Sequence, residues 1–546
     1  MKKIHILLIL AIAIMGACKE DTLDRYPTDA SVIESYYKTP NDATMAVNAA
    51  YNMLLRDDWW SLYIYSEILS DNCAGGAGSG DGGGFQRLDR LLQWPEADAF
   101  QIHWRTYYGA IYRTNIYLES EGLINWTGKE SLRNQYKAEI RFLRAYYHFY
   151  LARMFGNIPA LDHSLLPGEI PSRSTPEALY GLIIDDLKYC IENGLSTPYS
   201  QMTEANWGRA TKWAAEAMLA RVFLYYTGYY NKTEINGINN NVVQTYLDDV
   251  IANSGHGLVD HYASLWRVPT YSELKSIDLY AGEKNKEVVW SIRYNITGAG
   301  GNLYGASWWQ RMIGPRNTNV DPYGNGWGAA PVLPTTWNMY ENGDTRKTAT
   351  ILSWADEGLT YDFTGAQQAQ YTGYNLKKYD IASIEKRPED VVMGGTDWQT
   401  EAFEDYIVIR YSDVLLMAAE LHLLNGDAAT ALNYVNQVRT RAFGNTEHNL
   451  SSITLDAIYN ERRLEFVGEG IRYYDILRYC KGDFSKLVNY LTYVDQNDGG
   501  DFSKSIDTES LDVDGNSFAE KKGLFQIPQA EINLMKGKIQ QNEGYN

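Results

Sequence analysis

The chain has 546 residues, a formal net charge of −19 and 21% charged residues, a length that suffices for several domain-sized hydrophobic cores. The acidic balance argues against a nucleic acid as partner, because neutralising phosphates needs a basic face. Apart from Cys18, the cysteines (Cys73, Cys190 and Cys480) are too few and too scattered for a disulfide framework or a zinc site.

The first predicted element is a secretory signal. Lys2 and Lys3 precede an apolar run over residues 4–14, and small residues follow it, an order typical of a signal peptide. The apolar run is too short to span a bilayer comfortably. Cys18 stands directly after the small residues, as in a bacterial lipobox, where cleavage leaves a lipidated N-terminal cysteine. We therefore expect residues 1–17 to be removed and acyl chains on Cys18 to hold the protein to a membrane. An ordinary signal peptide with an incidental cysteine is the alternative.

Helix signals follow one another through the first half of the remaining chain. A threonine followed by a proline marks two helix starts, at Thr39 and Thr175, because threonine can cap a helix and proline fits its first turn. Apolar residues at helical spacing predict two more helices, over about 132–155 and 213–228.

A closely spaced helix pair is predicted further along. Residues 413–424 are predicted to form one helix, Asn425 and Gly426 its stop, and Asp427 the cap of a second helix that runs to about residue 442. Alanines gather where the two helices would approach each other. Such helix–turn–helix units resemble tetratricopeptide repeats, which bury their faces by stacking. The sequence therefore predicts a mainly α fold with a tetratricopeptide-like helical scaffold.

Two long segments, about 230–400 and 481–523, show little helical period. Short strands are predicted at 287–294 and 406–410. Irregular segments of this length inside a compact body usually carry function or border a binding face. We therefore expect a single domain over residues 18–546, in which the two segments are loop-rich, ligand-binding insertions.

Four motifs resemble those of a known family. They are residues 141–147 followed by 155–159, residues 410–420 followed by 436–439, residues 461–466 followed by 469–478, and residues 525–528 followed by 541–545. Their order and spacing, over essentially the whole chain after the signal, resemble the SusD/RagB family of nutrient-binding outer-membrane lipoproteins. The resemblance implies a SusD-like fold, a SusC-like TonB-dependent transporter as partner, and no cofactor.

The residues that follow the lipidated cysteine suggest where the protein is exported. Glu20 and Asp21 resemble the acidic signal that sends lipoproteins to the cell surface in Bacteroidetes. We therefore expect a surface-exposed protein, anchored by lipid in the outer membrane.

No motif indicates catalysis. The dense charges over 461–478 have the helical spacing of ion pairs that fix helix packing, and no nucleophile or metal ligand flanks them. Gly78, Gly80 and Gly83 satisfy the GxGxxG pattern, but we expect neither a strand before them nor a helix directly after, and hence no dinucleotide site. Asp81 is a single carboxylate, whereas calcium takes about 6–8 oxygen ligands. We expect a binding protein without a metal site, and not an enzyme.

Aromatic residues are abundant, with 43 Tyr and 15 Trp, and two clusters lie among Gly, Asn and Pro. These clusters are Trp308 with Trp309, and Tyr323 with Trp327. Side chains in such segments tend to be displayed. A flat ring beside polar groups suits a sugar, because the ring stacks on its apolar face while hydrogen bonds meet its hydroxyls. Core packing is an equal alternative for any one of them. The family resemblance implies further ligand contacts at Asp71, Asn72 and Trp94.

The leading hypothesis is a surface lipoprotein that captures an oligosaccharide and delivers it to a TonB-dependent transporter. A peptide ligand is the alternative within the same family. A glycoside hydrolase would need two carboxylates that face a sugar cleft. A purely structural scaffold would leave displayed tryptophans without a role.

Overall fold

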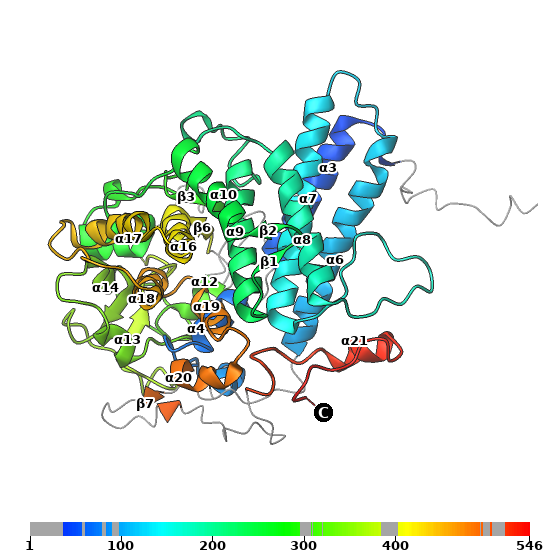
Figure 1. Ribbon diagram of the computed structural model, residues 1–546. Helices are drawn as coiled ribbons and strands as arrows, with labels where there is room; N and C mark the ends of the chain where they lie inside the picture. Colours follow the sequence, from blue (N-terminus) through cyan, green and yellow to red (C-terminus); the bar gives the residue numbers. More distant parts are fainter. Residues whose placement is uncertain are drawn as a thin grey trace, which may run out of the picture.

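The computed structural model describes residues 36–56, 61–78, 83–89, 98–294, 307, 309–318, 320–383, 402–491, 493–494, 503–504 and 519–545. Helices dominate them (Figure 1), which confirms the prediction of a mainly α protein. The longer helices are α3 (Pro40–Tyr51), α6 (Asp98–Ser120), α7 (Glu130–Phe155), α8 (Pro176–Asn193), α9 (Lys212–Tyr229), α10 (Asn240–Asn253), α16 (Tyr411–Leu424), α17 (Ala428–Phe443) and α18 (Leu455–Phe466). The shorter helices are α4 (Leu62–Ile68), α5 (Gly83–Asp89), α11 (Arg267–Pro269), α12 (Trp309–Ile313), α13 (Pro334–Asn338), α14 (Thr345–Thr350), α19 (Arg472–Tyr479), α20 (Leu487–Leu491) and α21 (Gln529–Leu534). The strands are β1 (Glu234–Ile235), β2 (Ile238–Asn239), β3 (Val288–Ile292), β4 (Ile351–Ser353), β5 (Tyr374–Leu376), β6 (Tyr406–Arg410), β7 (Tyr493–Val494) and β8 (Ser503–Lys504).

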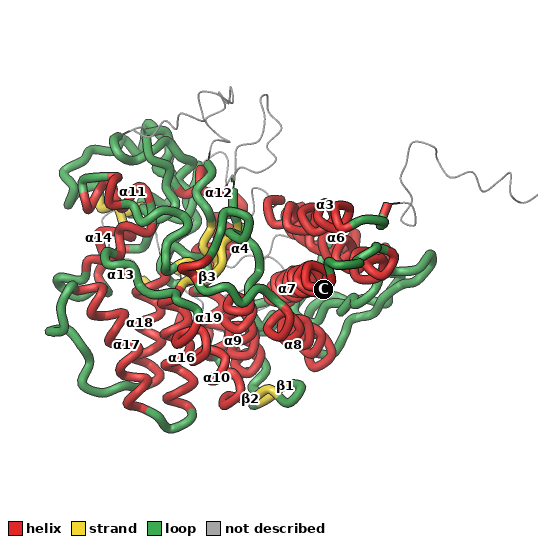
Figure 2. The backbone as a smooth tube through the Cα atoms, turned by 90° about the horizontal axis from the view of Figure 1, so that it is seen from above, coloured by secondary structure: helices red, strands yellow, loops and turns green. Residues whose placement is uncertain are grey.

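The longer helices form a curved row, and loops gather on the other side, around α11, α12 and α14 (Figure 2). Along the row α6 contacts α7, α7 contacts α8, α8 contacts α9, α9 contacts α10, α10 contacts α16 and α16 contacts α17. Stacking of successive helices is how helical-repeat scaffolds bury their apolar faces. This arrangement confirms the tetratricopeptide-like scaffold.

The predicted helix starts are confirmed at their caps. The Thr39 side chain accepts a hydrogen bond from the backbone N–H of Asp42, whose carboxylate accepts one from the backbone N–H of Thr39 at 2.7 Å, a capping box. The Thr175 side chain caps α8, and Asp427 caps α17. These caps satisfy backbone donors that have no partner within a helix.

The two predicted strands pair with each other. β3 and β6 are antiparallel, with Val288 opposite Arg410 and Ile292 opposite Tyr406. The predicted lack of helix in residues 230–400 is wrong for α10, whose Asn239 cap and buried Val243, Leu247 and Val250 place an apolar stripe against α9 and α16.

The expectation of no helix after the GxGxxG glycines is also wrong, because α5 begins at Gly83. Before it, residues 73, 76 and 78 make isolated bridges to other loops and do not form a strand, while residues 79–82 lie outside the described part. A dinucleotide site needs both the strand and the helix.

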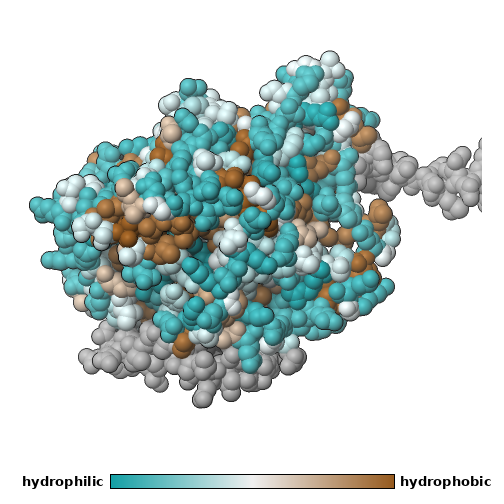
Figure 3. Space-filling view, viewed as in Figure 1, coloured by the Kyte–Doolittle hydropathy of each residue, from teal (hydrophilic) through white to brown (hydrophobic). Residues whose placement is uncertain are grey.

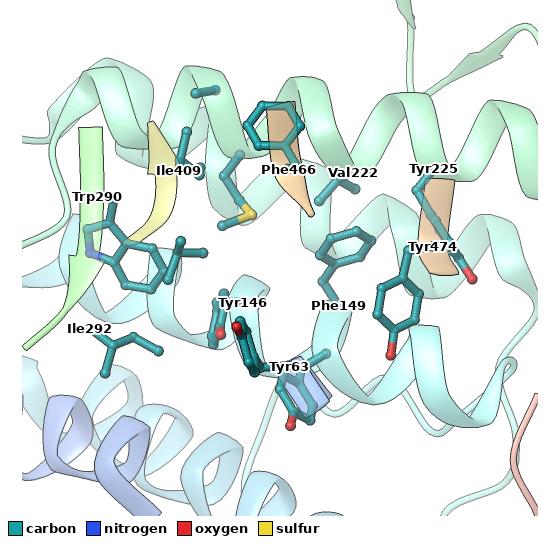
Figure 4. Packing of buried hydrophobic residues seen from close by; sticks show 14 of the residues in the cluster. Tyr63, Tyr146, Phe149, Val222, Tyr225, Trp290, Ile292, Ile409, Phe466 and Tyr474 are labelled. Carbon is teal, nitrogen blue, oxygen red and sulfur yellow. The ribbon is translucent and has the colours of Figure 1, made fainter. Parts of the chain in front are cut away.

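Aromatic side chains join the helical row to the strands. The indole of Trp290 in β3 meets the rings of Phe142 and Tyr146 in α7 edge to face, with centroids 4.8 and 5.1 Å apart. Figure 4 shows Trp290 and Tyr146 within the same core. This packing fixes β3 against the scaffold.

A buried ion network lies beneath the loops. Glu465, with no exposed surface, accepts hydrogen bonds from Arg346, Arg410 and Arg441, and Glu469 accepts them from Arg410. The predicted packing role of these charges is confirmed. The partners of Glu465 and Glu469 lie on other elements and not one helical turn away.

The surface in Figure 3 is mainly hydrophilic, with an apolar area over α16 and α17, where Leu424 is exposed. No helix among the described residues is both long and apolar enough to cross a membrane. The described cysteines Cys73, Cys190 and Cys480 are buried free thiols.

Candidate functional site

Asp71 and Asn72 are buried and engaged with other side chains. The Asp71 carboxylate accepts hydrogen bonds from Arg472 at 2.8 and 3.0 Å and pairs with Arg463 at 2.8 Å. Burial alone would raise the pKa of Asp71, yet these two guanidinium groups hold it below its usual value. Asn72 accepts from Arg463 at 3.1 Å and donates to Glu67 at 3.2 Å. In this conformation neither side chain presents a polar atom to a ligand.

The expectation that Trp309 and Tyr323 are displayed is wrong, because both side chains are buried. Trp309 packs on Tyr63 with ring centroids 4.2 Å apart. The Tyr323 hydroxyl donates to Glu357, and burial raises the pKa of that hydroxyl. Glycine-rich surroundings predict open loops, but here they accompany buried rings.

The glycines next to Tyr323 serve close packing of the backbone. A Cβ added to Gly324 would lie 2.2 Å from the carbonyl oxygen of Ile381, and one added to Gly326 would lie 2.3 Å from the backbone of Gly314. Only glycine permits such approaches. A glycine-rich segment is usually expected to form an exposed loop. Around Tyr323 the glycines instead allow two backbone segments to pack tightly together.

The remaining candidates have different positions. Trp327 is half-buried, and its backbone N–H donates to the carbonyl of Arg311 at 3.0 Å. Trp94, Trp308 and Cys18 lie outside the described residues, as does Asp81.

The fold brings together an aromatic surface that sequence reasoning missed. Phe363 stacks on Tyr371 with centroids 4.4 Å apart and planes 7° apart, and Tyr361 stacks on the buried Trp354 at 4.7 Å and 15°. Tyr361 and Tyr371 also touch, at 5.5 Å. Phe363 is 43% exposed, and the two tyrosines are half-buried. We call Tyr361, Phe363 and Tyr371 the aromatic ledge.

Polar groups adjoin the aromatic ledge and hold its loop. Arg316 donates to the carbonyl of Ala366 at 2.9 Å and accepts at its own carbonyl from the Tyr361 hydroxyl at 2.8 Å. Asn317 is exposed beside it. Gln370 accepts from the backbone N–H of Gly76 at 2.8 Å and donates to Asp89 at 2.6 Å. The ledge is therefore pre-organised, with flat apolar faces next to hydrogen-bonding groups.

Arg316 also connects the ledge to a residue that the sequence did single out. Its guanidinium lies 3.4 Å from the carbonyl oxygen of Trp327. A clue to the ledge was present in the sequence, since Tyr361, Phe363 and Tyr371 lie in one polar, loop-forming stretch. Tyr371 lies eight positions after Phe363 in the chain, and the folded loop brings their rings together.

A second aromatic surface borders α6. A groove of about 310 Å³ is lined by Trp104, Tyr108 and Tyr112 from this helix and by Glu531 of α21. Tyr112 is 53% exposed, while the Tyr108 hydroxyl donates to the carbonyl of Pro159 at 2.9 Å. This groove is apolar for most of its length, and the Arg105–Glu531 ion pair lies at its edge.

Two family models match the chain. The model described as SusD family matches residues 286–545, and the model described as starch-binding, associating with outer membrane, matches residues 81–224. A SusD-like protein of Bacteroides ovatus is 25% identical over 565 residues, which cover 97% of this chain and 93% of that protein.

Solved structures share the fold. Surface glycan-binding protein A of Bacteroides thetaiotaomicron, in complex with laminarihexaose, has a TM-score of 0.74 and 24% identity, over 93% of this chain and 100% of that one. A laminarin-binding SusD-like protein has a TM-score of 0.71 and 25% identity, again over 93% and 100% of the two chains.

Proposed function

Because this chain belongs to the SusD/RagB family, we propose that it is a glycan-binding lipoprotein of the outer membrane. It captures an oligosaccharide at the cell surface and passes it to a SusC-like TonB-dependent transporter. The starch-binding family model and the laminarin-binding relative support a carbohydrate as the ligand class. The observation on this chain that carries the proposal is the aromatic ledge.

The ledge suits a sugar for physical reasons. The free face of Phe363, backed by Tyr371, offers a flat apolar surface for the C–H face of a pyranose ring. Asn317 and Arg316 supply amide and guanidinium groups for the hydroxyls at the ring edge. Trp94, Trp308 and Trp327 are proposed as further contacts, whereas Asp71, Asn72, Trp309 and Tyr323 support the site from within. Segment 230–400 is then the insertion that carries most of the binding face.

No reaction is part of this proposal. Binding and release need only complementary surfaces, and the buried carboxylates of the ion network are paired with arginines and lysines. The peptide-binding alternative predicts the same ledge with a different ligand.

We expect Phe363→Ala to weaken glycan binding by about 1–3 kcal/mol, the scale of a lost aromatic anchor. Its melting temperature should change little, because the ring is 43% exposed and leaves no closed cavity. A glycan array on the purified protein identifies a ligand. Calorimetric titration of the wild type and the variant with that glycan then measures the loss.

Tyr112→Ala is the matched control, since it removes an exposed ring from the α6 groove. Full affinity in Phe363→Ala together with weakened binding in Tyr112→Ala would move the site to that groove. Chromatography of the glycan after incubation with the protein tests whether the protein hydrolyses it. If hydrolysis products form, and a single Asp or Glu substitution abolishes their formation, the protein is a hydrolase. Exclusive binding of peptides would favour the alternative ligand.

We expect Cys18→Ala to prevent lipidation and release the protein from the membrane fraction, because one cysteine carries the acyl chains. Labelling of cells with a fatty-acid analogue, followed by fractionation, measures both effects. A variant that still takes up the label and still sediments with outer membranes would contradict the anchor.

A further inference from the structure

A cavity of about 50 Å³ lies between α7, α9, α19 and β6. Figure 4 shows part of its aromatic lining, including Tyr63, Phe149, Tyr225 and Tyr474. A single water needs roughly 10–15 Å³ of such space. The cavity therefore has room for a few waters or for one small ion.

Arginines line the same cavity, and most of them are neutralised in a chain of buried ion pairs. Asp413 lies 2.5 Å from Arg221 and 2.6 Å from Arg462. The chain continues from Arg462 to Asp475 at 2.9 Å, from Asp475 to Arg478 at 2.8 Å, and from Arg478 to Glu420 at 2.7 Å. Three arginines thus meet three carboxylates, and this chain of pairs carries no net charge.

Arg153 is the arginine outside this balance. Its guanidinium lies 4.6 Å from the ring centroid of Phe149 and 4.4 Å from that of Tyr474. Within the described part of the chain it makes no ion pair and no hydrogen bond, and its Nε atom is buried. Ring faces attract a cation but do not neutralise its charge. Arg153, which is half-buried, therefore adds to the lining one positive charge that no carboxylate of the described residues pairs with.

Two further donors around the cavity have no acceptor among the described residues. Tyr225 is 3% exposed, and its hydroxyl makes no hydrogen bond. The Nε atom of Arg221 is likewise buried without an acceptor. Buried polar groups almost always have a partner, so such a group indicates a bound water or ion. Here the Tyr225 hydroxyl and the Arg221 Nε–H can both donate a hydrogen bond, and both line the same cavity as the positively charged Arg153. These groups favour a bound anion.

We propose that this cavity binds one small monovalent anion, of the size of a halide, held by Arg153 and the Tyr225 hydroxyl. The anion would neutralise the excess charge and accept hydrogen bonds from groups that otherwise have no acceptor. Since Arg153 lies on α7 and Tyr225 on α9, it would also link two helices of the scaffold. This site is separate from the aromatic ledge and does not depend on the glycan proposal.

Bromide tests the site directly. Crystals of the purified protein in sodium bromide should give an anomalous scattering peak in the cavity, within hydrogen-bond distance of Arg153 and Tyr225. In solution, replacing gluconate, which is too large for the cavity, by chloride at equal ionic strength should raise the melting temperature by about 1–3 °C. Bromide peaks confined to the protein surface would overturn the proposal.

Variants separate this site from a general salt effect. Arg153→Gln should abolish the chloride-dependent rise, whereas Lys538→Gln, which removes an exposed positive charge, should keep it. Tyr225→Phe keeps the ring that stacks on Tyr229 at 5.4 Å and removes only the hydroxyl, so it should reduce the bromide peak even if Arg153→Gln fails to fold. An equal chloride response in wild type and Arg153→Gln would also refute the site, as would a full bromide peak in Tyr225→Phe.

Discussion

Glu465→Gln is expected to lower the free energy of unfolding by about 3–5 kcal/mol. The carboxylate is completely buried and accepts hydrogen bonds from Arg346, Arg410 and Arg441. Glutamine has nearly the same shape but no charge, so three buried guanidinium groups lose their shared counter-ion. Urea unfolding followed by far-UV circular dichroism measures the loss. Glu543→Gln, which removes an exposed partner of Lys522, should leave the urea midpoint unchanged. An equal midpoint for Glu465→Gln and the wild type would show that the network does not stabilise the fold.

The effect of Glu465→Gln should depend on pH. Burial alone would raise the pKa of Glu465, yet Arg441, Arg410 and Arg346 hold it far below its ordinary value of 4.5. A carboxylate whose pKa is lower in the folded than in the unfolded state stabilises the fold at pH values above its unfolded-state pKa. This stabilisation is lost as the pH falls toward and through the folded-state pKa. The difference between wild type and variant should therefore be largest near neutral pH and narrow below about pH 4.5.

Trp309→Ala is expected to cost about 3–5 kcal/mol of folding stability. The indole is 1% exposed and lies against Tyr63, Tyr379 and Tyr406, with centroids between 4.2 and 5.5 Å away. Alanine would leave a cavity among rings that cannot collapse into it. Urea unfolding of this variant beside Phe363→Ala gives the comparison, since the exposed ring should cost far less. Unchanged stability with lost glycan affinity would instead make Trp309 a ligand contact.

Local signals in the sequence were sufficient to predict much of the scaffold. Thr39, Thr175 and Asp427 mark helix starts because a cap acts on the backbone within three residues of itself. The strand at residues 406–410 was predicted with the bounds that the structure has. The pairing of β6 with β3 was not predicted, because the two strands are far apart in the chain and no short-range pattern connects them.

The binding surface was harder to predict, for a physical reason. Glycine next to an aromatic residue is compatible both with an open loop and with two backbones in contact, and at Gly324 and Gly326 the second case holds. The position of Tyr323 depends on Glu357, which its hydroxyl contacts, and on Ala382, with which it forms a β-bridge, and both lie more than thirty residues away. The aromatic ledge is the opposite case, a surface that the sequence analysis did not predict. Its three rings come together only in the folded loop, which Arg316 holds through Ala366 and Tyr361.

The contacts of Asp71 have a consequence for the order in which the chain can complete its fold. Asp71 is neutralised by Arg463 and Arg472, and the nearby Glu67 accepts from the backbone N–H of Gly470 at 2.8 Å. A ribosome makes these partners almost four hundred residues after Asp71. During synthesis, the segment around Asp71 therefore stays without these partners until the last sixth of the chain begins to emerge. Any fragment that ends before residue 463 lacks both arginines that neutralise Asp71 and the backbone N–H that donates to Glu67.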